Sequence, residues 1–254
     1  MSWDPSIYLK FDDNRTRPAA ELLARVKAEA PKRVVDLGCG PGNSTALLAA
    51  RWPDAQVAGV DSSQEMLDKA ATSDIPASWH TSDIAAWRSE APVDVLFSNA
   101  ALHWLGDHDT LLPALMDQVA PGGTLAVQMP RNFDAPSHTL LRDTVEETGN
   151  PELIALLRDN PVAGAEIYHR ILAPKAASVD IWETTYLQVL TGDDAVLAWT
   201  SGTALVPFTS ALEGEACDTF IEAYRQKLAL AYPPEPDGST LFAFRRIFIV
   251  AQKH

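Results

Sequence analysis

The chain has few cysteines, few basic residues and no long apolar run, and each shortage argues against a class of protein. Its two cysteines, Cys39 and Cys217, lie far apart and outside any CxxC pair, so neither a zinc site nor a redox dithiol is expected. No apolar stretch reaches the ~18 residues that span a bilayer. The opening MSWDPSIYLKFDDNR lacks the basic and apolar parts of a signal peptide. We therefore expect a cytoplasmic protein that holds no metal and binds no membrane.

The charge balance indicates what kind of partner the chain can have. Twenty Lys and Arg stand against 34 Asp and Glu, which gives a net charge of −14 among 254 residues. Such a field repels nucleic-acid phosphates and anionic lipid, so the expected partner is a small molecule. An anionic substrate would have to be held by basic side chains gathered locally. The composition leaves the oligomeric state open.

Between residues 32 and 129, short apolar runs alternate with amphipathic stretches, as is typical of α/β proteins with a parallel sheet. We expect strands at 33–37, 56–61, 77–80, 93–98 and 124–129, and helices at 45–51, 64–71 and 110–119. Pro121, Gly122 and Gly123 are expected to end the last helix and turn the chain into the fifth strand. Residues 30–130 would then form a cofactor-binding core.

Beyond Pro130, prolines punctuate short helical patterns at 139–148 and 152–158, and further helices are expected at 193–200 and 213–231. Two stretches rich in β-branched and aromatic residues, 179–190 and 241–250, predict late strands. We therefore expect one α/β domain over residues 1–254, with a doubly wound, mostly parallel seven-stranded sheet. Residues 131–177 and 191–238 would form an inserted helical cap over its carboxyl edge.

The most informative segment is VVDLGCGPGNST, residues 34–45. A strand leads into Gly38, Gly40 and Gly42, and the missing Cβ atoms would let a ligand approach the backbone closely. Asn43, Ser44 and Thr45 offer helix N-cap chemistry. Asp61 ends the next strand about twenty residues later, where ribose hydroxyls would need an acceptor. A tight turn that binds nothing is the alternative.

Two kinds of cofactor compete for this loop. A dinucleotide site favours GxGxxG, whereas this loop reads GxGxG and has Asn43 at the third small position. Asp36 stands two residues before the first glycine, where it would repel a pyrophosphate but suit a ligand that carries an ammonium group and a sulfonium. These features favour S-adenosylmethionine over a nicotinamide cofactor. Asp36 could also bond to the loop's own backbone, and the two roles can coexist.

Four separated segments, DLGCGPG, Asp61, SDI at 82–84 and SNAALHW at 98–104, resemble the class I S-adenosylmethionine-dependent methyltransferases. The resemblance implies that Asp61 holds the ribose hydroxyls, that Asp83 receives the adenine amino group and that Ile84 and Met66 flank the ring. His103 and Trp104 would line the methyl-transfer region as positioning residues, with no general base. The cofactor-binding residues that this implies are Asp36, Gly38, Gly40, Gly42, Asp61, Ser62, Met66, Asp83, Ile84 and Asn99.

A wider resemblance covers nearly the whole chain. The segments WDPSIYLKFDDNRTRPAAELL, VQMPRN, APSH, VDIWETTY and FRRIFIVA are similar to the trans-aconitate 2-methyltransferase family. The resemblance implies methyl transfer to a carboxylate of trans-aconitate, giving a monomethyl ester. A carboxylate with a pKa near 4 is already ionised at neutral pH, so no Ser-His-Asp or Cys-His arrangement is needed.

The other carboxylates of such a substrate need partners, for which bidentate arginine is best suited. Arg245 and Arg246 are adjacent on an expected strand and point to opposite faces, so at most one reaches a site easily. Surface salt bridges for the arginines, and core packing for the aromatic residues, are the alternatives. The substrate-binding candidates are Arg17, Arg131, Tyr168, Trp182, Arg245 and Arg246.

Two positions depart from that family's pattern. Arg131 stands where an acidic residue is common, and Val206 stands where an arginine often precedes the proline. We hypothesise that Arg131 compensates for the missing arginine. The competing functions are methylation of another small acid or of a carrier-bound malonyl group, a nicotinamide-dependent oxidoreductase, and a non-catalytic S-adenosylmethionine-binding protein.

Overall fold

The computed structural model describes residues 16–254, so most of the N-terminal segment compared above lies outside the described residues. The chain divides into two compact units. Unit 1 comprises Met1–Pro130, Pro161–Glu183 and Ile247–His254. Unit 2 comprises Arg131–Asn160 and Thr184–Arg246.

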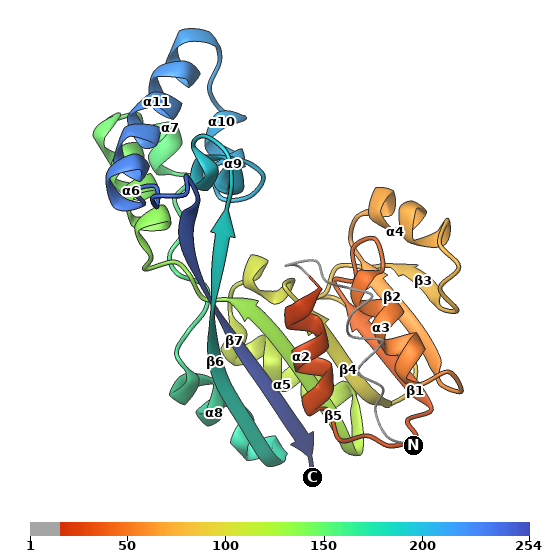
Figure 1. Cartoon of the computed structure of the whole chain (residues 1–254). Coiled ribbons are helices and arrows are strands. Elements are labelled where there is room, and N and C mark those ends of the chain that lie inside the picture. Colours follow the sequence, from red (N-terminus) through yellow and green to blue (C-terminus); the bar gives the residue numbers. More distant parts are fainter. Residues whose placement is uncertain (1–15) are drawn as a thin grey trace. The chain divides into compact units, whose positions relative to one another are not determined.

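A seven-stranded sheet of order β3-β2-β1-β4-β5-β7-β6 confirms the expected α/β fold class. The pairs β1–β2, β1–β4, β2–β3 and β4–β5 are parallel, whereas β6 and β7 run in opposite directions (Figure 1). Because parallel strands end at the same edge, β1, β2 and β4 deliver Leu37, Asp61 and Asn99 to one edge. The strands are β1 (Arg33–Leu37), β2 (Gln56–Asp61), β3 (Ser78–Thr81), β4 (Val93–Asn99), β5 (Val119–Pro130), β6 (Ala176–Leu190) and β7 (Thr240–Lys253).

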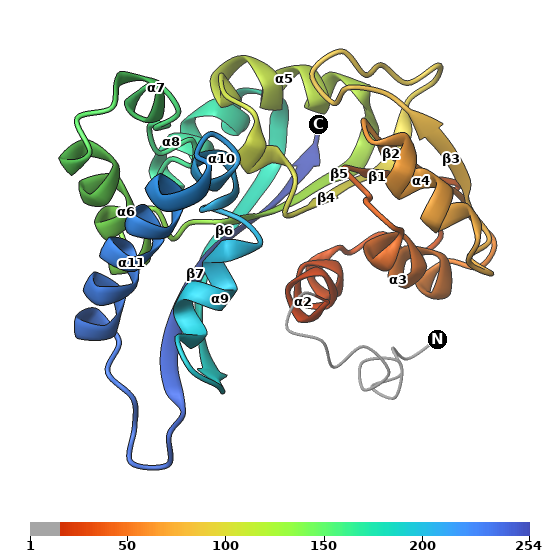
Figure 2. The same cartoon turned by 90° about the horizontal axis from the view of Figure 1, so that it is seen from above.

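In unit 1, helices cover both faces of the sheet. Helices α2 and α3 lie on one side, and α5 and α8 lie on the other (Figure 2). This double cover explains the unbroken apolar runs of β1 and β4, whose Val34, Leu37, Val95 and Leu96 are fully buried. The helices of unit 1 are α2 (Arg17–Arg25), α3 (Asn43–Arg51), α4 (Gln64–Ala71), α5 (His108–Gln118), α8 (Ala165–Leu172) and the 3₁₀ turns η1 (Leu102–Trp104) and η2 (Ala173–Lys175).

The predicted turn before the fifth strand is wrong. Strand β5 begins at Val119, and Pro121, Gly122 and Gly123 lie within it, beside a register shift in β4 between Val93 and Val95. Gly122 has φ +74°, and a Cβ on Gly123 would lie 2.8 Å from the Asp94 carbonyl oxygen. The glycines therefore form a bulge in the strand rather than a turn before it.

Unit 2 is mainly helical. Its apolar core joins α6 and α11 with β7, through side chains such as Val145, Tyr224 and Phe242. The predicted helix 152–158 is shorter than expected, because α7 ends at Ile154. The helices of unit 2 are α6 (Pro136–Glu147), α7 (Pro151–Ile154), α9 (Ala195–Ser201), α10 (Val206–Thr209) and α11 (Gly214–Ala231).

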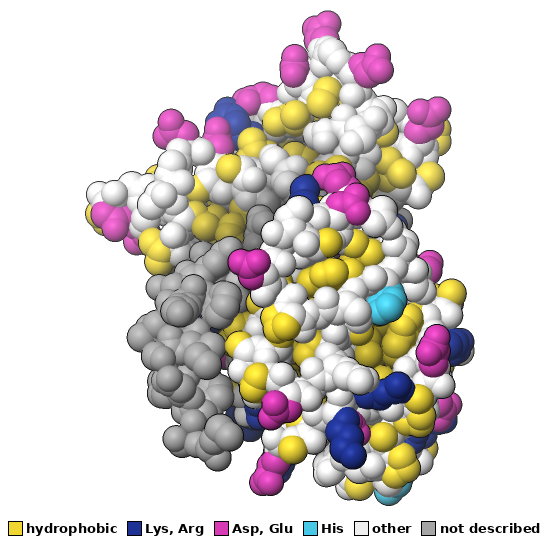
Figure 3. All heavy atoms as spheres, turned by 90° about the vertical axis from the view of Figure 1, so that its right-hand side faces the viewer, with side chains coloured by type: hydrophobic (Ala, Val, Ile, Leu, Met, Phe, Trp, Pro, Cys, Tyr) yellow, Lys and Arg dark blue, Asp and Glu magenta, His cyan; other side chains and the backbone are white. Residues whose placement is uncertain are grey.

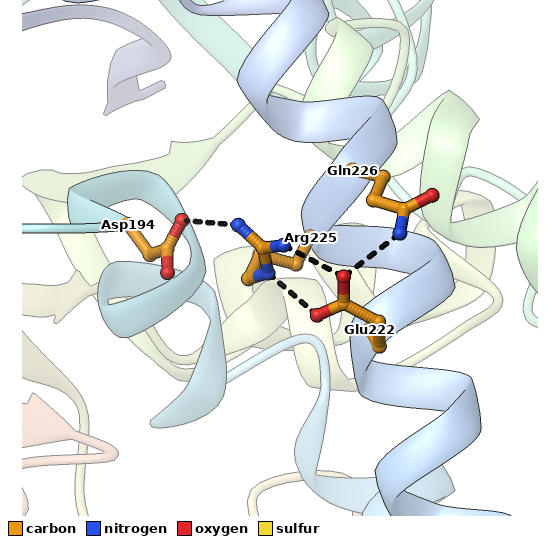
Figure 4. A network of polar contacts seen from close by, with 4 residues as sticks. All are labelled: Asp194, Glu222, Arg225 and Gln226. Atoms are coloured by element: carbon orange, nitrogen blue, oxygen red, sulfur yellow. Dashed lines mark hydrogen bonds and ion pairs between the residues drawn. The ribbon is translucent and has the colours of Figure 1, made fainter.

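An ion-pair network lies on the surface of unit 2 (Figure 4). Arg225 on α11 donates to both carboxylate oxygens of Glu222 at 2.6 Å and lies 3.5 Å from Asp194. Hydrogen bonds from Arg225 and Gln226 lower the pKa of Glu222 to about 2. Because these side chains are well exposed, water screens the network, which adds little to stability.

The boundaries of the units differ from those of the expected cap. Residues 161–177, expected within the cap, belong to unit 1, where α8 packs against α5.

On the face drawn in Figure 3, acidic side chains are spread widely, in keeping with the net charge. Within residues 16–254, no helix is long and apolar enough to cross a membrane.

Candidate active site

The three loop glycines between β1 and α3 serve different purposes. All have positive φ, at +71° for Gly38, +54° for Gly40 and +92° for Gly42. A Cβ on Gly38 would lie 2.2 Å from the Ala101 Cβ, and one on Gly42 would lie 2.9 Å from the Trp79 ring. Of the three, only Gly40 has no atom of residues 16–254, its chain neighbours aside, within 4 Å of the Cβ position. The expectation that all three glycines make room for a ligand is therefore corrected: Gly38 and Gly42 make room for other parts of the protein, and only the Gly40 position is left open by the described residues.

Asp61, at the end of β2, binds the glycine loop directly. Its Oδ2 accepts a 2.8 Å hydrogen bond from the Gly40 backbone N–H, and its Oδ1 accepts one of 2.9 Å from the Ser63 N–H. The side chain is half-buried, and each carboxylate oxygen has further lone pairs available. Asp61 thus ties the open position of the loop to the start of α4.

Asp36 is fully buried beneath the loop. Its Oδ2 accepts 2.7 Å hydrogen bonds from the hydroxyls of Ser44 and Thr45, while its buried Oδ1 has no partner among residues 16–254. Burial raises the pKa of Asp36 to about 6, although the two hydroxyls counteract the rise. The predicted N-cap role of these hydroxyls is wrong, since α3 is capped by Gly42 without a side-chain bond.

The segments after β2 and β3 border the same loop. Ile84 lies 3.2 Å from the Cβ position of Gly38, whereas Asp83 is exposed and accepts a 2.7 Å hydrogen bond from the Ala85 N–H. Ser62 is exposed, and Met66 is exposed on the first turn of α4. Sequence reasoning missed Ser63, whose hydroxyl caps α4, although Ser63 before QEM is an ordinary N-cap signal.

The chain beyond β4 forms the other side of this edge. Asn99 presents a buried Oδ1 that has no partner in the described part of the chain. Ala100 takes an unusual φ of +54°, and its N–H donates to the Gln128 carbonyl at 2.9 Å. The turn η1 then carries His103 and Trp104, whose ring centroids are 4.7 Å apart. Trp104 is 57% exposed, which is unusual for such a large apolar ring.

In unit 1, the side chains predicted to bind the substrate make hydrogen bonds or ring contacts with other residues of the protein. Arg17 donates a 2.8 Å hydrogen bond to Glu21 on the exposed side of α2. Tyr168 is fully buried, and its hydroxyl lies 2.7 Å from His108 Nδ1, so the structure does not support a substrate contact. Trp182 stacks on Phe248 at 4.8 Å with an interplanar angle of 8°, and it too serves packing.

In unit 2, the two adjacent arginines of β7 have different surroundings. Arg245 donates from Nη2 to both carboxylate oxygens of Asp134 and from Nε to the Arg131 carbonyl at 3.0 Å, so its guanidinium is used structurally. Arg246 is only 6% exposed, and it lies 4.7 Å from the Phe244 ring centroid. Burial lowers its pKa to about 10. Arg131 is half-buried, and its role in substrate binding stays a prediction.

The comparisons with known proteins agree with this geometry. Residues 34–123 match the family model described as a methyltransferase domain, which is the class that the fold and the glycine loop define. A phosphoethanolamine N-methyltransferase 2 of Haemonchus contortus, solved with S-adenosyl-L-methionine, shares the fold with a TM-score of 0.55 and 17% identity, over 97% of this chain and 56% of that one.

Relatives of nearly equal length specify the family further. The trans-aconitate 2-methyltransferase of Azoarcus sp. strain BH72 is 48% identical over 98% of both chains. That of Klebsiella pneumoniae strain 342 is 45% identical over 99% of this chain and 98% of its own. The chain therefore belongs to the trans-aconitate 2-methyltransferase family, and the alternative of a nicotinamide-dependent oxidoreductase is set aside.

Proposed function

We propose that this protein transfers the methyl group of S-adenosylmethionine to a carboxylate of trans-aconitate, acting on the free acid in the cytoplasm. The observation that carries the proposal is the open position at Gly40, bonded to Asp61 within a chain of this family. The methyl donor supplies an electrophilic methyl group on a sulfonium.

The residues at the edge of the sheet fit such a donor. The buried Asp36 Oδ1 and Asn99 Oδ1 both lack partners within the described chain, and both can accept hydrogen bonds from an ammonium group. Asp61 keeps lone pairs for the ribose hydroxyls beyond its bonds to Gly40 and Ser63. Ile84 beside Gly38 offers an apolar wall for a ring.

The chemistry asks little of the protein beyond positioning. The acceptor is already an anion at neutral pH, so His103 need not remove a proton. Alignment of the acceptor oxygen with the methyl group is what the site must provide, and such alignment is worth several kcal/mol. The exposed Trp104 and the half-buried His103 on η1 are suited to hold the acceptor and to exclude water.

A product assay tests the proposal. The purified protein is incubated with S-adenosylmethionine and, separately, trans-aconitate, cis-aconitate, citrate and a carrier-bound malonyl group, and the products are analysed by mass spectrometry. We expect one added methyl group on trans-aconitate and little or none on the others. Methylation of another acid alone would reassign the substrate, and donor binding without turnover on any acid would favour a sensor.

A further inference from the structure

A buried chain of hydrogen bonds in unit 1 links α8 to the turn that carries His103 and Trp104. Tyr168, fully buried on α8, places its hydroxyl 2.7 Å from His108 Nδ1, at the start of α5. The other ring nitrogen, Nε2, lies 3.0 Å from the Leu102 carbonyl oxygen, at the first residue of η1. The Ala163 N–H donates to the Tyr168 oxygen at 3.1 Å.

When His108 is neutral, the donors and acceptors of this chain fit only one direction. A backbone carbonyl accepts but cannot donate, so Nε2 of His108 must carry the proton that bonds to Leu102. For neutral His108, Nδ1 then holds a lone pair, and the Tyr168 hydroxyl donates to it. The Tyr168 oxygen remains an acceptor for Ala163. Each link therefore has both a donor and an acceptor.

Few backbone hydrogen bonds lie within the turn at the end of this chain. Three residues in a 3₁₀ turn make few hydrogen bonds of their own: Trp104 N–H donates to the Ala101 carbonyl at 3.1 Å, and Leu105 N–H to the Leu102 carbonyl at 3.0 Å. Ala100, two residues before the turn, has a left-handed backbone that costs a non-glycine residue energy. His108 fills the remaining acceptor site of Leu102 and so pins the turn at its first residue.

The geometry points to Tyr168 and His108 as positioning residues for methyl transfer, which act through Leu102 by fixing η1 and its side chains His103 and Trp104. This inference rests on the proposed function, because it assigns η1 to the acceptor side of the reaction. It replaces the substrate contact predicted for Tyr168, and it gives a role to His108, which the sequence reasoning passed over. The glycine loop, Asp36 and Asp61 make none of the bonds in this chain, so donor affinity should be spared.

The primary variant is Tyr168→Phe, which removes one hydroxyl and leaves the aromatic ring in place. We expect kcat to fall roughly tenfold or more, since small displacements of positioning groups are costly, while the affinity for S-adenosylhomocysteine changes less than about twofold. The Trp104 and Leu105 amides should exchange with deuterium faster than in wild type. His108→Leu should behave alike, whereas His108→Gln, which keeps one donor and one acceptor, should recover part of kcat.

Tyr224→Phe is the matched control for general loss of stability. Tyr224 is an equally buried tyrosine in unit 2, and its hydroxyl donates to the Ser137 carbonyl at 2.6 Å. We expect Tyr224→Phe to lower Tm to a similar extent but to leave kcat and the exchange of η1 unchanged. An unchanged kcat in Tyr168→Phe, or an equal fall in both variants, would overturn the inference. If wild type transfers no methyl group, the proposed function fails, and unchanged exchange in Tyr168→Phe would separately reject the support of η1.

Discussion

The Asp61 carboxylate accepts a 2.8 Å hydrogen bond from the backbone N–H of Gly40, the one loop glycine whose Cβ position is left open by residues 16–254. The end of β2 therefore fixes the position at which a ligand can approach the loop between β1 and α3. The same carboxylate reaches forward to Ser63, the cap of α4. The Asp61 side chain thus bonds both to the loop that precedes α3 and to the residue that caps α4, beside the proposed donor site.

Replacing Asp61 by alanine should weaken donor binding specifically. We expect the Kd for S-adenosylhomocysteine to rise at least tenfold, because both the ribose acceptor and the bond that holds Gly40 are lost. Asp94→Ala is the matched control: Asp94 also accepts two backbone N–H bonds, from Lys32 at 2.7 Å and Arg33 at 2.9 Å, but at the opposite end of the strands. Titration calorimetry that gave both variants the same Kd would contradict this role of Asp61.

Asp36 should make both stability and donor binding depend on pH. Its pKa is about 6 in the fold against 3.8 for an ordinary aspartate, so the folded state binds the proton more tightly and loses stability as pH rises from about 4 to 6. Asp36→Asn removes this loss, which is on the order of 3 kcal/mol for a pKa raised by about 2. The free energy of unfolding of Asp36→Asn, relative to that of wild type, should therefore be higher at about pH 7.5 than at about pH 4.5. Denaturant unfolding at the two pH values measures this difference.

Donor affinity should respond in the opposite sense. Ionised Asp36 attracts an ammonium group, so wild-type affinity should increase as pH rises through about 6, while Asp36→Asn binds weakly and with little pH dependence. A variant that is more stable yet binds worse would assign Asp36 to the ligand rather than to the fold. If both proteins bound the donor with equal affinity and equal pH dependence, Asp36 would have no role in donor binding. Its role would then be limited to its hydrogen bonds with Ser44 and Thr45.

Arg131 is the arginine on which the proposed substrate specificity depends most. Arg131→Ala should raise the KM for trans-aconitate about tenfold or more, with little change in donor affinity, because a charge-assisted contact to a substrate carboxylate is lost. Arg142→Ala offers a control in the same unit, since Arg142 donates to the Arg158 carbonyl at 2.7 Å. Initial-rate measurements that show an unchanged KM for Arg131→Ala would reject the compensation for Val206.

Gly59 on β2 should be required for packing alone. A Cβ there would lie 2.4 Å from the Trp79 ring and 2.9 Å from Cys39 Sγ, so Gly59→Ala forces these side chains to move. Overpacking of this kind costs about 1–3 kcal/mol, which thermal unfolding would record as a lower Tm. Gly106→Ala, where a Cβ meets nothing within 4 Å, should leave Tm nearly unchanged. Equal Tm values for the two variants would contradict the crowding at Trp79.

The sequence was sufficient for the strands of unit 1, because continuous apolar runs such as those of β1 and β4 have few alternatives to burial between helices. The sequence could not show which loop glycines pack against the protein and which one faces a ligand. The side chains that crowd Gly38 and Gly42 belong to Ala101 and Trp79, which lie far along the chain. The bulge at Gly122 was missed for the same reason: the proline-glycine signal is shared by turns and bulges.

Chain order predicts which residues lie at the ends of strands, but not which distant side chains they contact. Asp61 ends a strand next to the glycine loop, as the chain order predicts. Tyr168 was predicted to contact the substrate, but its hydroxyl bonds to His108, 60 positions away. The alternation of a strand predicts different surroundings for Arg245 and Arg246, but it does not predict that Asp134 pairs with Arg245. Contacts between segments that are far apart in the sequence could not be predicted from the pattern of residue types.

The most direct test of the account is a titration of S-adenosylhomocysteine into wild type, Gly40→Ala and Gly149→Ala. The two glycines are closely matched, with φ +54° and +61° and with no contact to the added Cβ within 4 Å among residues 16–254, so both substitutions cost similar backbone strain. The account predicts saturable binding to wild type and to Gly149→Ala, and binding at least tenfold weaker to Gly40→Ala. Binding of equal strength to all three proteins, or to none, would contradict a donor site at this loop.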